Sequence, residues 1–130
     1  MLLNLKHKQL AVYKEVRSLI KEAYLITKHL PEEERFNMIS QIRRAALSVK
    51  LNLAEGASRK SVKERTRFYE VARGSVVEVD AAAETAIDLG YFDENNLEKL
   101  KENFSQVRIS KKDQAKNSLN TADGFVLFKK

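Results

Sequence analysis

A line of small and polar side chains marks the stretch from residue 41 to residue 56. Its members recur at steps of four and three, which keeps them along one side of a helix. They are Gln41, Ala45, Ser48, Asn52 and Glu55. A buried polar group without a hydrogen-bond partner costs about 1–3 kcal/mol. We therefore expect this polar line to be bonded to another helix, another subunit or a ligand.

The simplest expectation for the polar line is a structural one. Because buried charges are normally paired, Glu55 should meet Arg44 or Arg59, and Asn52 should help to tie its helix to the start of the next. Catalysis is the other chemistry that these residue types allow. Glu55 is a possible base, and Asn52 or Gln41 is a possible substrate-orienting group.

Catalysis, however, needs a nucleophile, a metal or a convergent acid–base pair held in a cleft. The chain has no cysteine, only two histidines, and no glycine-rich phosphate loop. We therefore expect a protein that is not an enzyme and that uses no metal and no cofactor.

A basic run occupies residues 58–67. It carries five basic side chains against one acidic side chain, Glu64. The five are Arg59, Lys60, Lys63, Arg65 and Arg67. Cations at a helix N-terminus are mildly unfavourable with the helix dipole, so the cluster needs another reason. We expect these side chains, together with Arg43, to contact phosphates of RNA or DNA, the alternative being a solvated helix end.

Composition limits the fold to one small helical domain. The chain has 130 residues, 43% of them hydrophobic, with one proline and four glycines, which disfavours a turn-rich β architecture. The net charge of +6 makes an anionic partner plausible. No uncharged run approaches the length of about 18 residues that a membrane span needs, so we expect a cytoplasmic location and no membrane partner.

The pattern of apolar residues predicts four helices. The first covers about residues 5–29. The second should start at Pro31, because prolines and carboxylates favour a first helical turn, and should end at Gly56 in a left-handed cap. Its expected apolar stripe is Phe36, Ile39, Ile42, Ala46, Val49 and Leu53.

The third helix should start at Ser61, whose side chain forms a capping box with Glu64, and should end at Gly90. Gly74 lies inside it, and we expect a neighbouring helix to approach the backbone there. The fourth helix should begin near residue 93 or 95 and end near Val107. We expect a bundle over residues 1–109 and an irregular C-terminal tail over 110–130, whose apolar run at 124–128 could dock on a neighbour or pair as a strand.

Several segments also resemble a known family in their order and spacing. They are Leu30-Pro31, residues 41–46 with Ser48, residues 52–56 with Arg59, Phe68, Ala72, Gly74-Ser75, Glu78 and residues 89–91. Over roughly residues 8–95 the chain resembles the bacterial four-helix-bundle proteins encoded within intervening sequences of 23S ribosomal RNA genes. Members of this family have been labelled as a small ribosomal protein. The chain departs from the family pattern after about Val107.

The resemblance implies an antiparallel up-down-up-down bundle. It also implies kinship with the accessory variability proteins of diversity-generating retroelements, which are similar bundles that form five-membered rings and bind nucleic acid and a reverse transcriptase. We therefore expect a homo-oligomer, by resemblance a homopentamer, that binds RNA or DNA. The alternative is an assembly or adaptor module that binds itself or another protein, such as a reverse transcriptase, without nucleic acid.

The charge pattern supports contacts between copies of the chain. Residues 68–96 carry seven acidic side chains and one basic side chain, the reverse of the run before them. Arg44 of one subunit could thus meet Glu70, Glu78 or Glu84 of the next, and a contact between two different surfaces closes into a ring if the rotation allows. The candidate residues for subunit contacts or the polar line are Gln41, Arg44, Ser48, Asn52, Glu55, Gly74 and Glu78.

Overall fold

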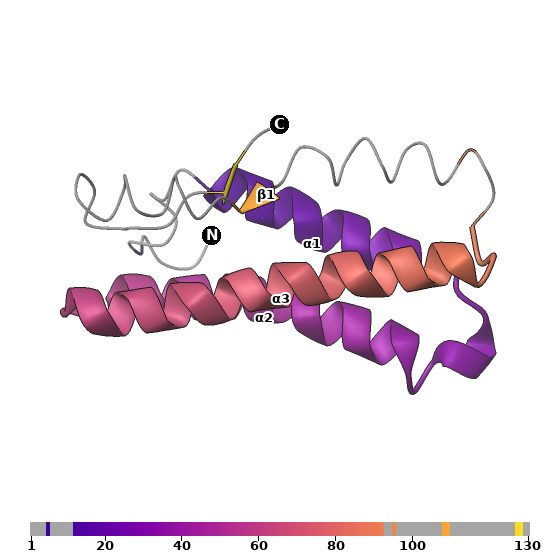
Figure 1. Cartoon of the computed structure of the whole chain (residues 1–130), viewed down its shortest axis with the longest axis horizontal. Helices are drawn as coiled ribbons and strands as arrows, with labels where there is room; N and C mark the ends of the chain where they lie inside the picture. Colours follow the sequence, from indigo (N-terminus) through magenta and orange to yellow (C-terminus); the bar gives the residue numbers. More distant parts are fainter. Residues whose placement is uncertain (1–4, 6–11, 93–94, 96–107, 110–126, 129–130) are drawn as a thin grey trace.

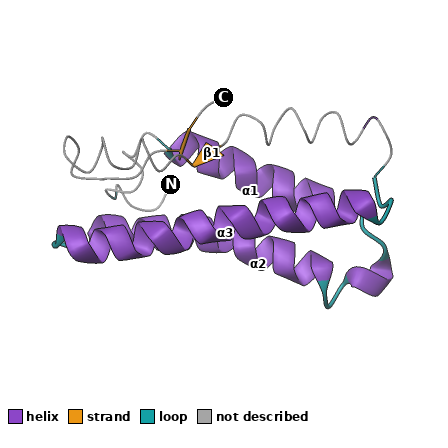
Figure 2. Cartoon of the chain, in the orientation of Figure 1, coloured by secondary structure: helices purple, strands orange, loops and turns teal. Residues whose placement is uncertain are grey.

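A computed structural model of the chain describes residues 5, 12–92, 95, 108–109 and 127–128 (Figure 1). The described part contains three long helices, α1 (Tyr13–Thr27), α2 (Met38–Ser58) and α3 (Val62–Asp88), and a single 3-10 turn, η2 (Glu32–Glu34). Two short strands, β1 (Arg108–Ile109) and β2 (Leu127–Phe128), pair in antiparallel fashion. Figure 2 shows that most of the described residues are helical.

The predicted all-helical class is thus confirmed, with the two-residue strands as a small addition. The four-helix count is not confirmed, because the segment predicted to form the fourth helix lies almost entirely outside the described residues. The same holds for most of the predicted tail, from which only the β2 residues are described. Among the described residues, no helix is long and apolar enough to cross a membrane.

Consecutive helices pack side by side because their connections are short, and α3 runs along α2 for most of its length (Figure 1). All three helices contribute to one apolar core. Both α2 and α3 bury several alanines, whose small side chains allow neighbouring helices to pack closely. These residues are Ala45, Ala46 and Ala57 on α2 and Ala72, Ala83 and Ala86 on α3, all buried.

The start of the second helix differs from the prediction. Pro31 and the glutamates after it form only the single turn η2, and α2 begins at Met38. The helix is interrupted at Asn37, whose φ of −123° and ψ of −96° are not helical. The Glu34 carboxylate accepts a 3.3 Å hydrogen bond from the backbone N–H of Met38 and so satisfies one donor at the new helix start.

Gly56 also has a different role from the predicted one. It lies inside α2, which continues to Ser58, and it is not in the left-handed conformation. A methyl group at Gly56 would lie 2.6 and 2.8 Å from two ring carbons of Tyr69 on α3. Because the Tyr69 ring is 97% buried against this position, a glycine is required for the close approach of α3, which is a tertiary requirement.

Both predicted ends of the third helix are confirmed. The Ser61 side chain accepts a 3.1 Å hydrogen bond from the backbone N–H of Glu64. At the other end Gly90 has a φ of 74°, the backbone N–H of Gly90 bonds to the carbonyl of Ile87, and that of Tyr91 bonds to the carbonyl of Ala86. These two bonds form the Schellman motif that commonly ends a helix at a glycine.

Candidate nucleic-acid interface

The basic side chains predicted from residues 59–67 gather at one end of the molecule, on the turn between α2 and α3. We call this set, Arg59, Lys60, Lys63, Arg65 and Arg67, the basic turn. In Figure 1 this turn is the pink end of the helical pair, and the α1–α2 connection lies at the opposite end. The chain reverses direction here over Arg59 to Ser61, where Arg59 and Ser61 have extended backbones.

Arg65 holds the turn together. Its Nη1 donates hydrogen bonds to the backbone carbonyls of Arg59 at 3.2 Å and Lys60 at 2.9 Å. The side chain is half-buried by these contacts. Arg65 therefore satisfies two carbonyls of the connection, which makes it a structural residue as well as part of the positive surface.

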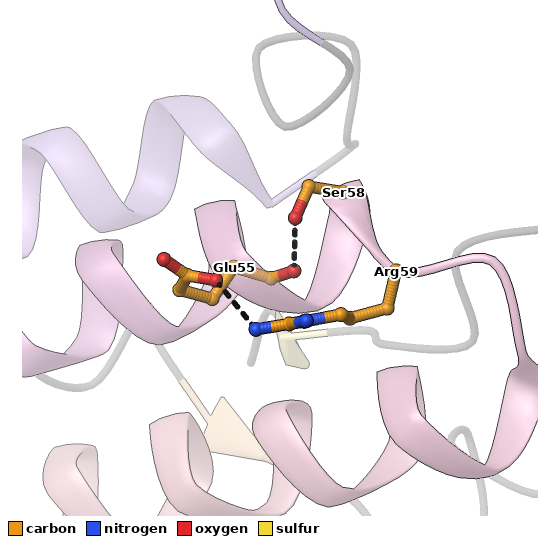
Figure 3. Close-up of polar contacts among 3 residues, drawn as sticks. All are labelled: Glu55, Ser58 and Arg59. Atoms are coloured by element: carbon orange, nitrogen blue, oxygen red, sulfur yellow. Dashed lines mark hydrogen bonds and ion pairs between the residues drawn. The ribbon is translucent and has the colours of Figure 1, made fainter.

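Arg59 is also engaged within the chain. Its Nη2 lies 3.2 Å from Oε2 of Glu55 (Figure 3). Its guanidinium also lies over the ring of Phe68, at 5.0 Å. The hydroxyl of Ser58 donates a 2.7 Å bond to the carbonyl of Glu55 in the same turn. The prediction that Glu55 meets Arg59 or Arg44 is thus confirmed, with Arg59 as the partner.

The remaining three cations point into solvent. Lys60, Lys63 and Arg67 are all exposed, and none of them takes part in the ion pairs found among the described residues. Lys63 and Arg67 are four residues apart on α3 and so lie on one side of the helix, about 5–6 Å apart at their Cβ atoms. The basic turn therefore offers three side chains to an anion and keeps two for its own structure.

Arg43, the sixth predicted phosphate contact, lies elsewhere. Its Nε donates a 2.9 Å hydrogen bond to Oγ1 of Thr27, and its guanidinium lies 5.1 Å from the ring centre of Tyr24. It is half-buried between α1 and α2. Since it precedes Arg59 by 16 helical positions, it is about 24 Å from the basic turn along α2. The structure thus separates Arg43 from the other five residues and gives it the role of joining two helices.

The polar line is only partly buried. Asn52 Nδ2 donates to the carbonyl and the hydroxyl of Ser48 at 2.9 and 3.0 Å, and the hydroxyls of Ser48 and Ser75 lie 2.9 Å apart. Both bonds of Asn52 stay within α2, and it is Ser48 that joins α2 to α3, at Ser75 in the middle of that helix. These bonds therefore do not tie Asn52 to the start of the third helix as predicted. Gln41 and Glu55 are exposed, so the expectation of a continuous buried polar line is wrong for these two residues.

The other candidate contact residues also lie on the surface. Arg44 and Glu78 are exposed. Gly74 is exposed as well, and among the described residues no atom lies within 4 Å of a methyl group placed there. The predicted close approach of a helix at Gly74 is therefore wrong for the described part of the chain, whereas the glycine that does permit close packing is Gly56.

The charged side chains on α3 are placed unfavourably with respect to the helix dipole. Basic side chains lie near its N-terminus, where the helix dipole is positive, and Glu84 and Asp88 lie exposed in its last turns, where the dipole is negative. Each such placement costs a few tenths of a kcal/mol to about 1 kcal/mol at the surface. The side chains thus strengthen the polarity of the backbone along the whole helix.

Two features at the opposite end differ from what the sequence indicates. The hydroxyl of Tyr91 donates a 2.9 Å hydrogen bond to Oε1 of Glu34, which ties the end of α3 to the α1–α2 connection. This bond, with smaller effects of desolvation and of the charges of Glu34 and Glu33, raises the pKa of Tyr91 above 10.0. Phe36, predicted to be in the apolar stripe of the second helix, lies outside α2 and is 89% exposed.

No signal within the sequence alone distinguishes Phe36 from a buried residue, because it fits the helical spacing of Ile39 and Ile42. Because the helix is interrupted at Asn37, Phe36 does not share the buried side of α2 with Ile42. The Glu34–Tyr91 contact spans 57 positions and is likewise invisible to local spacing.

A search of curated proteins gives no match. The family model described as 23S rRNA-intervening sequence protein matches residues 8–112, which extends the resemblance beyond residue 95 and past Val107. The match covers most of the chain, including all three long helices and the whole basic turn, and the chain therefore belongs to the 23S rRNA-intervening sequence protein family.

Proposed function

We propose that this protein is a non-enzymatic binding protein that holds RNA or DNA through phosphate contacts at the basic turn. The observation that carries the proposal is the exposure of Lys60, Lys63 and Arg67 together at one end of the molecule. The positive N-terminus of α3 and the negative C-terminus of α2 lie at the same turn and offset each other, so the attraction for an anion comes from these three side chains. Family membership supports an association with ribosomal RNA genes.

Contacts of this kind read the backbone and the shape of a nucleic acid. Among the described residues there is no zinc site and no aromatic sheet surface that would read base edges. Three phosphate contacts on duplex nucleic acid imply a loss of about 40-fold in affinity per subunit when the salt concentration rises fourfold. Affinity should therefore depend strongly on salt and weakly on sequence.

The test is a fluorescence anisotropy titration of a labelled RNA duplex at 50 and 200 mM salt. The triple variant Lys60→Ala, Lys63→Ala, Arg67→Ala should bind at least tenfold more weakly at low salt and show a shallower salt dependence. The matched control is Lys14→Ala, Lys21→Ala, Lys28→Ala, which removes three exposed charges from α1 and its C-cap. Equal weakening by the two triple variants, or no binding by the unmodified chain at low salt, would contradict the proposal.

We further propose that the chain acts as a homo-oligomer, with a pentamer as the state that the family resemblance implies. The acidic side chains along α3 and the basic turn are complementary surfaces of one chain, and Arg44 and Glu78 are both exposed and available to a neighbour. Light scattering should give several times the chain mass of 14.9 kDa. A monomer at micromolar concentration would refute the proposed homo-oligomer.

An assembly module without nucleic acid is the second candidate function. The observation that favours it is Phe36, because a fully exposed phenylalanine in a structured turn is typical of a protein contact. The RNA titration above separates the two candidates, since an assembly module would oligomerise and leave the labelled duplex unbound.

A further inference from the structure

Phe36 is the most exposed large apolar side chain in the described part of the chain. It is 89% exposed, in the three-residue turn between η2 and α2, and the guanidinium of Arg35 lies over its ring at 5.3 Å. Glu32 and Glu33 beside it are also exposed. Glu32 forms a 3.5 Å ion pair with Arg35, whereas Glu33 takes part in none of the ion pairs among the described residues. The α1–α2 connection therefore presents an aromatic projection that has one ion pair and one further carboxylate beside it.

A second apolar feature lies on the outer side of α2. Leu47 and Leu51 are one helical turn apart and are 42% and 55% exposed. Arg44 precedes Leu47 by three residues, so it lies on the same side of the helix, and it is exposed as well. We call Leu47 and Leu51, with Arg44 at their edge, the leucine patch. It is an apolar strip with Arg44 at one end and the Glu55–Arg59 ion pair at the other.

The two features cannot meet within one chain. α2 begins at Met38, directly after the Phe36 turn, and continues without interruption past Leu51. At 1.5 Å per residue, Leu47 and Leu51 lie about 14 and 20 Å from the start of the helix. Any contact between the aromatic projection and the leucine patch must therefore join two molecules.

We propose that Phe36 of one copy packs on the leucine patch of a second copy, as the central contact between subunits. This inference rests on the homo-oligomer proposed above and names its surfaces. The charges support a second copy as the occupant, because Glu33 beside the projection and Arg44 beside the patch are both exposed and take part in none of the ion pairs among the described residues. Glu33 of one copy can therefore meet Arg44 of the next, in place of Glu78.

The size of the groups fits the role of an anchor. A phenylalanine buries about 150–250 Å² on contact, and aromatic residues at the centre of an interface carry much of its binding energy. The contact is heterologous, since each chain supplies the projection to one neighbour and the patch to the other. Each subunit therefore makes this contact twice.

The first test compares single variants by light scattering. Phe36→Ser and Leu51→Ser should each reduce the mass to that of the 14.9 kDa monomer at concentrations where the unmodified chain is assembled. The matched control is Leu25→Ser on α1, which is 45% exposed and lies outside both features and outside the acidic surface of α3, and it should keep the assembled mass. Circular dichroism should show the same helix content in all variants, because each altered side chain is exposed.

The second test mixes the two assembly-defective variants. A Phe36→Ser chain keeps its leucine patch, and a Leu51→Ser chain keeps its phenylalanine, so the mixture can form one intact contact. It should give a species of twice the chain mass, whereas neither variant alone does so. Recovery by mixing requires folded partners, which guards against loss of assembly through misfolding.

The outcomes separate the two proposals. A monomeric unmodified chain overturns the proposed oligomer and this contact together. An assembled unmodified chain whose mass is unchanged by Phe36→Ser or by Leu51→Ser overturns the contact alone. The contact is also overturned if the mixture of the two variants remains monomeric.

Discussion

The two connections between the long helices are built in different ways. In the α2–α3 turn, several polar side chains form contacts within the turn. Arg65 bonds to two of its carbonyls, Arg59 pairs with Glu55, and Ser61 caps the next helix. The α1–α2 connection is longer, carries a non-helical interruption at Asn37, and leaves Phe36 in solvent.

The difference shows how a small bundle can divide its tasks between its ends. A turn whose polar groups are satisfied locally fixes the close packing of α2 on α3, with Gly56 and Tyr69 at its base. The other connection is attached to the end of α3 through Tyr91 and Glu34 and can present an apolar side chain outward. We expect substitutions at the α2–α3 end to lower the stability of the fold more than substitutions at the α1–α2 end.

The largest effect should come from Gly56→Ala, paired with Gly74→Ala as its control. Alanine at 56 must displace the buried Tyr69 ring, and we expect a net loss of about 1–2 kcal/mol in the free energy of unfolding. Alanine at 74 meets open space in a helix and should add up to about 1 kcal/mol. Urea denaturation of both variants measures the difference, and shifts of the same sign would contradict this account of Gly56.

A smaller effect is expected for Arg65→Ala, which leaves the carbonyls of Arg59 and Lys60 to water. The loss should be about 1 kcal/mol, because these hydrogen bonds are charged but partly exposed to solvent. Arg67→Ala removes the same side chain two residues later, at an exposed position, and should change stability by less than about 0.5 kcal/mol. Thermal unfolding of the two variants would disprove a structural role for Arg65 if both shifted equally.

The smallest effect is expected at the opposite end, for Tyr91→Phe. The pKa of Tyr91 is raised because its hydroxyl donates to Glu34, so the folded chain holds this proton more tightly than the unfolded chain. The stability that this bond adds is present below pH 10.0 and is lost as the pH rises through the raised pKa. The difference in stability between the unmodified chain and Tyr91→Phe should therefore shrink above pH 10. A difference that stays constant between pH 8 and pH 11 would argue against the contact.

Features that depend on residues close together in the sequence were predictable, and features that depend on distant residues were not. The Ser61 cap and the end at Gly90 were predictable, because both depend on residues a few positions apart. The start of α2 was predicted wrongly, because Pro31 and the glutamates do start a helical turn, and only the backbone at Asn37 ends it.

The candidate site was predictable to the same extent. The basic run and the Glu55–Arg59 pair are local, and both were found in the sequence. The division of the run into structural and free cations was not, since it depends on which carbonyls the turn brings to Arg65. Arg43 was assigned to the wrong surface because its partner Thr27 is 16 positions away on another helix.

The charge arrangement of α3 has a consequence for encounters in solution. The helix has 27 residues and is therefore about 40 Å long, several times the screening length of about 8 Å at physiological salt. The charges at one end of α3 therefore act only weakly on a negatively charged molecule that approaches the other end. Within about 8 Å of such a body the lysine-bearing tip is attracted and the acidic tip is repelled, so the final approach favours encounters through the lysine-bearing tip.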